Sequence, residues 1–141
     1  MGVRDNPRLL LLSARGDDEM TITAIQQGDQ YYLPVRIKRG DTYITNENCD
    51  DARVKLGSFL ATFSDGTLSY GMIDNPEYDA VTNNTVPEQI WVWLFPITQE
   101  RSLALNGGEV KMQVAYKNGE TIRPSKEKCV WVDTSIITEE W

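Results

Sequence analysis

The residue types that most often carry out catalysis are scarce in this chain. Its 141 residues include no histidine, which removes the commonest general base and the commonest metal-ligating side chain. Without an imidazole, no serine or cysteine can be activated in the usual catalytic triads. There is also no glycine-rich phosphate-binding loop, because Gly107 and Gly108 fall in a turn between two predicted strands. We therefore predict a protein that is not an enzyme and has no catalytic residue and no cofactor.

Three acidic clusters, at residues 17–19, 50–51 and 74–79, offer oxygen ligands for a hard cation such as calcium. None of them has the spacing of a known calcium-binding loop, so we interpret them as solvated surface and predict no metal site. A carboxylate pair of the glycosidase type is compatible with the composition. A chain of 141 residues nevertheless leaves little room for a substrate cleft.

Two cysteines, Cys49 and Cys129, lie 80 residues apart. Two cysteines are not a disulfide framework, and they pair only if the fold brings them together. We therefore do not expect a disulfide.

The composition narrows the class of partners. The net charge is −7 and the fourteen basic residues are scattered, so we expect no nucleic-acid binding. No apolar run approaches the roughly 20 residues that span a bilayer. The leucines at 9–12 are too short a run for a secretory signal. The length fits one domain. Because neither a spanning segment nor a secretory signal is predicted, we expect the protein to be made in the cytosol.

The elements that must position any site are almost all strands. The segment EVKMQVAYKNGETIRP alternates apolar and polar residues, and Asn118-Gly119 predicts a hairpin turn within it. Asp65-Gly66 predicts a second hairpin, and Pro34 places its strand at a sheet edge or at a bulge. Eight or so short strands predict an all-β antiparallel sandwich or barrel, of which we take the sandwich, with at most one helical turn in residues 98–105.

The run IWVWLFPITQE, residues 90–100, is apolar on both faces of an extended chain. Trp91, Trp93 and Phe95 share one face, and we interpret them as packing residues between two sheets. The alternative is an aromatic face that docks on another subunit or on sugar. We predict that Trp93 and at least one of Trp91 and Phe95 are buried, because an exposed stripe of this size invites aggregation.

Two segments do not fit a compact sandwich. We divide the chain into an N-terminal arm, residues 1–19, and a sandwich domain, residues 20–141, into which a long polar loop, residues 73–89, is inserted. The arm is a frayed end, an extra edge strand or a contact with a neighbouring molecule; the loop is a solvated excursion or such a contact. The C-terminal residues 138–141 either fold back onto their own sandwich as an edge strand or place Trp141 in a neighbour's pocket as an anchor. The candidate partner-contact residues are Leu9, Leu10, Leu11, Leu12, Asn75, Pro76, Tyr78, Ile137 and Trp141.

The order of several short motifs resembles that of a group of small bacteriophage-encoded proteins. The motifs are YYLPVRI, CDDARVKLGSF, FSDGTLSYG, WLFPITQERSLAL, GGEVKMQVAY and VDTSIITEEW, which together cover roughly residues 20–141. The most specific of them is WLFPITQE, residues 93–100. The resemblance implies an immunoglobulin-like (Ig-like) β-sandwich and a structural or accessory role in the virion. The Cys–Trp–Cys signature of antibody domains is absent, because Trp91 follows Cys49 by 42 residues.

Two functions from different classes follow. The first is a structural protein of a phage particle, made in the bacterial cytoplasm and assembled in several copies with other virion proteins in the tail, neck, head fibre or decoration layer. The second is a module that binds carbohydrate or a host surface through Trp91, Trp131 or Trp141 and the loops. Under the second function, exposed aromatic side chains should line a groove on one monomer.

Overall fold

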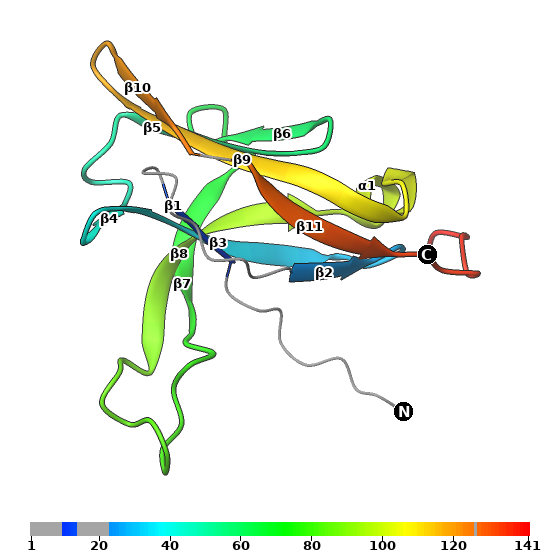
Figure 1. The fold of residues 1–141 in the computed structure, drawn as a ribbon, viewed down its shortest axis with the longest axis horizontal. Coiled ribbons are helices and arrows are strands. Elements are labelled where there is room, and N and C mark those ends of the chain that lie inside the picture. The colour runs from blue at the N-terminus through cyan, green and yellow to red at the C-terminus, as the bar shows by residue number, and fades with distance from the viewer. Residues whose placement is uncertain (1–9, 14–22, 126) are drawn as a thin grey trace.

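Strands make up most of the computed structural model, which describes residues 10–13, 23–125 and 127–141, with side chains from residue 25 onward. Eleven strands in these ranges form two β-sheets (Figure 1). The first sheet has the order β1 (Leu10–Ser13), β3 (Tyr31–Arg39), β8 (Gln89–Ile97) and β7 (Ser69–Asp74), and β4 (Thr42–Ile44) also pairs with β3. The second has the order β2 (Thr23–Gln26), β11 (Lys128–Asp133), β9 (Gly108–Asn118), β5 (Asp51–Leu56) and β6 (Phe59–Thr62), and β10 (Thr121–Pro124) also pairs with β9.

One hydrophobic core joins the two sheets, as the predicted sandwich requires. The first sheet contributes inward-facing residues of β3 and β8, including Leu33, Val35 and Phe95. The second contributes the alternate residues of β5, β9 and β11. The predicted face of β9 is confirmed, since Met112, Val114 and Tyr116 are buried while Val110 is half-buried. On β11 the apolar residues Val130 and Val132 are buried.

The long apolar run is strand β8, and its predicted burial is confirmed. Trp93 and Phe95 are at most 1% exposed, whereas Trp91 is 52% exposed. Ile90 and Val92 are also buried, although they are not part of the core between the sheets. Trp91 is exposed because β8 extends past the end of its pairing with β3.

The predicted hairpin at Asn118-Gly119 is confirmed. Asn118 pairs with Thr121, and Gly119 adopts a positive φ of 57° that other residues rarely accept. The predicted hairpin at Asp65-Gly66 is wrong. Gly66 has a positive φ, but β6 belongs to the second sheet and β7 to the first, so this turn connects the two layers.

Pro34 predicted either an edge strand or a bulge. Strand β3 lies between β1 and β8, so it is not an edge strand over its length. Residues 33–35 pair one for one with residues 95–93 of β8, so this pairing has no bulge either. The described pairing of β1 with β3 begins at Val35, one residue after Pro34, so the missing N–H removes no bond from it. The sheets are also not purely antiparallel, as β1 runs parallel to β3 and β2 parallel to β11. Residues 10–13 of the predicted arm therefore form an edge strand of the first sheet.

The one helical turn expected in residues 98–105 is helix α1 (Gln99–Ala104), which follows β8 directly. The Thr98 hydroxyl accepts a hydrogen bond from the Arg101 N–H and caps the helix. Ser102, fully buried, donates its hydroxyl to the Asp29 carbonyl at 2.8 Å and accepts from the Gly28 N–H. These bonds attach α1 to the turn between β2 and β3.

Candidate functional site

The first sheet divides into a fork beside Trp93. The pairing of β3 with β8 ends at Val35 and Trp93. Beyond that point β3 pairs with β4 and β8 pairs with β7, so the two pairs of strands separate (Figure 1). The indole Nε1–H of Trp93 donates to the Ile44 carbonyl at 2.9 Å and holds the base of the fork together.

A recess of about 330 Å³ lies in this fork. Its walls are formed by residues of β3, β4 and β7 and by four consecutive residues of β8, Ile90 to Trp93. The volume is at the lower limit of small-molecule sites. At about 330 Å³ the fork recess is larger than the recess beside the β9–β10 hairpin, which has about 140 Å³.

Aromatic rings make up one side of the recess. Tyr70 stacks on Trp91, with centroids 5.8 Å apart and an interplanar angle of 13°, and its ring also lies 4.7 Å from that of Trp93. On the other side, the Arg36 guanidinium lies 3.7 Å from the centroid of the Tyr43 ring. Exposed aromatic side chains therefore line a recess on one monomer, which is the arrangement expected for a binding module.

Charges of both signs surround the recess. Burial raises the pKa of the Tyr70 hydroxyl, the positive Arg36 opposes this shift, and Glu47 adds to it. The Lys38 amine lies 5.5 Å from the centroid of the Tyr43 ring. The β3–β4 side of the fork thus presents two cations, with Glu47 nearby.

The loop of residues 75–88 projects from the sheets at the ends of β7 and β8 (Figure 1). Hydrogen bonds hold it together: buried Asn75 donates its amide to the Pro87 carbonyl and accepts from the Glu77 N–H. Asp79 accepts from the Val81 and Thr82 N–H groups and forms a two-bond bridge with Asn83. Three acids, Glu77, Asp79 and Glu88, and no basic residue lie in this loop.

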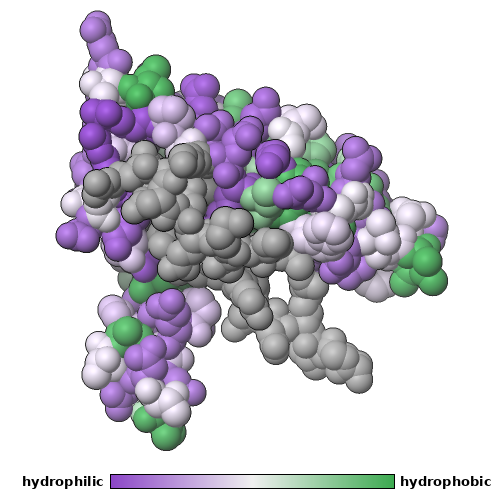
Figure 2. Space-filling view, viewed as in Figure 1, coloured by the Kyte–Doolittle hydropathy of each residue, from purple (hydrophilic) through white to green (hydrophobic). Residues whose placement is uncertain are grey.

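The C-terminal residues 134–141 lie outside both sheets. Ile136 is 99% exposed, Ile137 67% and Trp141 fully exposed. The segment is held at its ends, because Gln26 donates to the Thr134 carbonyl and the Trp141 N–H donates to Gln99. Apolar side chains gather at the end of the molecule where this segment lies and at the tip of the 75–88 loop (Figure 2).

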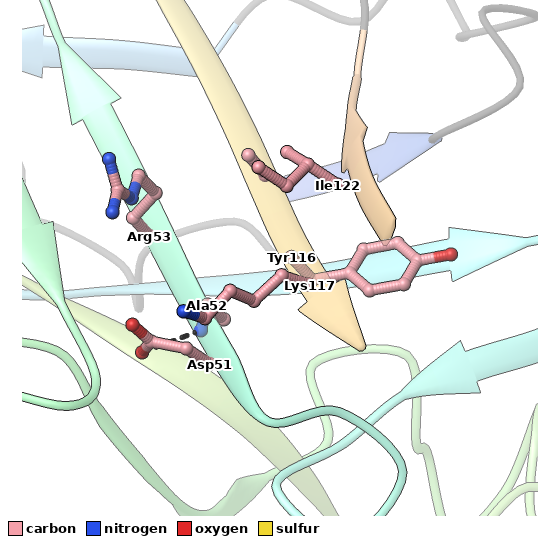
Figure 3. A pocket seen from close by; sticks show the side chains of 7 residues that line it. Asp51, Ala52, Arg53, Tyr116, Lys117 and Ile122 are labelled. Carbon is pink, nitrogen blue, oxygen red and sulfur yellow. Dashed lines mark hydrogen bonds between the residues drawn. The ribbon is translucent and has the colours of Figure 1, made fainter. Parts of the chain in front are cut away.

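A second recess lies on the second sheet beside the β9–β10 hairpin (Figure 3). Its volume is about 140 Å³, smaller than the sites that hold drug-sized ligands. The Asp51 carboxylate at its wall accepts hydrogen bonds from the Ala52 and Ser64 N–H groups. Asp51 thus stabilises the local backbone.

Both cysteines are free, as expected. The Cys49 thiol lies 3.1 Å from the Thr45 carbonyl, and the Cys129 sulfur lies 3.4 Å from the Lys111 amine. In the described ranges no three histidine, cysteine, aspartate or glutamate side chains lie together as a metal site would require. The described residues also contain no helix that is long and apolar enough to span a membrane.

The structure distributes the predicted contact residues over three places. Leu10, Leu11 and Leu12 form strand β1, and Leu9 lies outside the described residues. In the loop, Pro76 is exposed, Tyr78 is half-buried and hydrogen-bonded to Glu88, and Asn75 is engaged internally. Ile137 and Trp141 lie on the exposed C-terminal segment, far along the chain from the fork.

The residues of the fork were missed by sequence reasoning, apart from the tryptophans. Arg36, Tyr43 and Tyr70 come from three strands, and only the register of those strands brings them together. No family model matches the chain, and no curated protein matches it by sequence.

Proposed function

We propose that this protein is a structural component of a bacteriophage virion, present in several copies and acting through protein–protein contacts. One observation carries the proposal: apolar side chains that the monomer does not cover lie at opposite ends of a closed sandwich. Among the exposed apolar side chains, Ile136, Ile137 and Trp141 lie on the segment held beside the end of β8, and Met72 and Trp91 lie opposite each other near its beginning. Exposed apolar groups that adjoin one another, as Met72 and Trp91 do across β7 and β8, mark contact surfaces.

The strand order supports an Ig-like sandwich. In constant-type Ig domains one sheet has the order A-B-E-D, and variable-type domains extend the G-F-C sheet with C′. Here the order β1-β3-β8-β7 corresponds to the first arrangement, and β11-β9-β5-β6 to the second. The parallel β1–β3 pair departs from this scheme. The motifs in residues 20–141 that resemble phage-encoded proteins point in the same direction.

The test is quantitative mass spectrometry of purified particles of the virus that encodes the chain. We expect peptides of the protein in the particles, in several copies relative to the major capsid protein and retained after density-gradient purification. Finding the protein in the infected-cell lysate and not in the particles would contradict the proposal.

A second candidate is a module that binds carbohydrate or a host surface. The observation that favours it is the aromatic recess with Trp91, Tyr70 and Tyr43. Its test is binding of the intact protein to a panel of bacterial surface oligosaccharides, with Trp91→Ala and Trp131→Ala as matched variants. Binding that is lost only in Trp91→Ala supports it, and an absence of binding to every oligosaccharide contradicts it.

A further inference from the structure

The residues that line the recess show whether it lies over a face of β8 or along the edge of that strand. Side chains alternate between the two faces of a strand. A hollow over one face of β8 would therefore be lined by every second residue, but this recess is lined by four consecutive ones, Ile90 to Trp93. It therefore lies along the edge of β8.

The backbone of β8 has free bonding capacity along that edge. Pro34 has no N–H, so its pairing with Leu94 cannot be a hydrogen-bonded pair. Hydrogen bonds between β3 and β8 consequently fall on alternate residues of β8, which include Trp93. By the same alternation, the N–H and C=O groups of Trp91 point into the fork, where no described strand pairs with them.

A strand-forming segment without a strand partner exists elsewhere in the chain. Residues 134–141, TSIITEEW, contain four β-branched residues, Thr134, Ile136, Ile137 and Thr138, which favour extended backbone. They form no strand in the monomer, and their apolar side chains are exposed. An exposed strand edge and an extended apolar segment are the two partners of β-strand addition.

Charge favours the same pairing. Glu139 and Glu140 follow the two isoleucines, and the β3–β4 side of the fork carries Arg36 and Lys38 beside Tyr43. Trp141 adds an aromatic ring to a recess lined by Trp91, Tyr70 and Tyr43. The segment therefore matches the recess in backbone, apolar surface and charge.

Within one molecule, residues 134–141 are held at the end opposite the fork and do not reach it. The Trp141 N–H donates to Gln99, two residues after the end of β8, whereas Trp91 lies near the beginning of that strand. At about 3.3 Å per residue, the strand between them separates these points by roughly 20 Å or more. The C-terminal segment and the fork are also at opposite ends in Figure 1.

We infer that residues 134–141 of one copy add as a strand to the free edge of β8 in the fork of a second copy. The contact is head-to-tail, so repetition generates a ring or a filament. This inference rests on the proposed multi-copy role and names the contact that builds it.

The test uses the full-length chain carrying Ile136→Glu and Ile137→Glu, so that its own segment does not compete. A fluorescent peptide of residues 133–141 is added, and anisotropy is measured. We expect saturable binding that weakens at least about tenfold when the peptide carries the same two substitutions. Arg36→Glu in the protein should weaken binding, and Glu139→Lys with Glu140→Lys in the peptide should restore it.

N-methylation of single peptide amides tests strand addition itself. Only alternate N–H groups of an added strand face the edge it joins. Methylating Ile136 or methylating Ile137 should therefore give unequal effects, with one modification abolishing binding and the other largely sparing it. Equal effects of the two modifications would overturn strand addition, as would binding to an oligosaccharide with no binding to the peptide.

The oligomeric state separates this inference from the proposed function. Sedimentation velocity of the wild-type chain should show concentration-dependent multimers that the Ile136→Glu, Ile137→Glu variant loses. Val81→Glu, at an apolar position of the loop that is 87% exposed, is the control and should leave the multimers intact. If the tail variant still multimerises and still enters particles, the inference is wrong and the virion role stands. If the wild-type protein is absent from particles, the proposed function fails as well.

Discussion

The buried side chain of Trp93 both packs against other rings and donates a hydrogen bond. Its ring meets Phe63 edge-on at 5.3 Å and Tyr70 at 4.7 Å, and its Nε1–H is the donor that reaches across the fork to Ile44. Its neighbour Trp91, two residues earlier on the same face, is half exposed. Two residues of the same type therefore have different roles, which follow from where the pairing with β3 ends.

Replacing Trp93 with phenylalanine should lower the free energy of unfolding by about 2–3 kcal/mol. The smaller ring leaves a cavity, and the buried Ile44 carbonyl loses its donor. Trp91→Phe is the matched control and should change stability by less than about 1 kcal/mol, because a ring remains against Tyr70. Urea denaturation measures both variants. Equal losses in the two would show that the Trp93 bond does not stabilise the fork.

Cys49 should be a slow nucleophile. Burial raises the pKa of its thiol, and the negative charges of Asp51 and Asp50 raise it further. The thiolate is the reactive form, so alkylation of the native protein near pH 8 should be slower than alkylation of the same cysteine in urea. In the native protein the rate should rise only at higher pH than in the unfolded chain.

Asp50→Asn removes one of the charges that raise this pKa. The substitution should lower the pKa of the Cys49 thiol, shift its pH–rate profile to lower pH and speed its alkylation at pH 8. Mass mapping distinguishes Cys49 from Cys129. A profile in the native protein that coincides with the profile in urea would contradict the role of burial.

The sequence predicted which segments form strands, but it did not predict which strands pair with one another. Alternation in β9 and the Asn118-Gly119 turn depend on neighbouring residues, which sequence reasoning can evaluate. Asp65-Gly66 has the same local chemistry, yet the strands on either side of it enter different sheets. The partner of a strand is decided by burial in the whole sandwich, as the position of β3 between β1 and β8 also shows.

The same distinction explains how much of the candidate site was predictable. Ile137 and Trp141 were predicted as contact residues because apolar side chains in a short segment are best buried against a neighbouring molecule, and both are exposed in the monomer. The fork could be predicted only if the end of the pairing between β3 and β8, at Trp93, were known. The register of two strands cannot be read from the composition of either one. Asn75 was interpreted as a contact residue because it lies in a long polar loop, but its side chain bonds within that loop.

Asn75→Ala should loosen the 75–88 loop specifically. The substitution removes the donor for the Pro87 carbonyl and the acceptor for the Glu77 N–H, which together should lower the local free energy of opening by about 1–3 kcal/mol. Hydrogen exchange should accelerate in residues 75–88 and stay unchanged in β9. Asn84→Ala, with one long exposed bond to Ala80, is the control. Unchanged exchange in Asn75→Ala would show that the backbone bridge at Asp79 and Asn83 suffices.

At the scale of the whole molecule, the sheets leave different edges open. The first sheet is bounded by β1 on one side and by β7 on the other, and the fork opens where β4 and β8 separate. One core fills the space between the layers, whereas beyond Trp93 no described strand pairs with β8 on the side of the fork. The protein therefore combines a closed interior with an open strand edge.

Strand β1 covers one edge of β3. Its four residues pair with Val35, Arg36, Ile37 and Lys38 of β3. Removing residues 1–13 should uncover this length of β3, whereas removing residues 1–9 leaves β1 in place. The comparison between the two truncations isolates the contribution of the strand.

We expect the 1–13 deletion to melt roughly 4–8 °C below the 1–9 deletion. The hydrogen bonds between β1 and β3 should contribute about 2 kcal/mol to the free energy of unfolding. In a chain of this size, each kcal/mol corresponds to a change of about 2–4 °C in melting temperature. The uncovered β3 edge should also pair between molecules, so light scattering should rise on heating in the longer deletion first. Calorimetry and scattering on the same samples check both effects. Equal melting temperatures would mean that β1 is not needed for stability, and the four residues would then be available to pair with another copy.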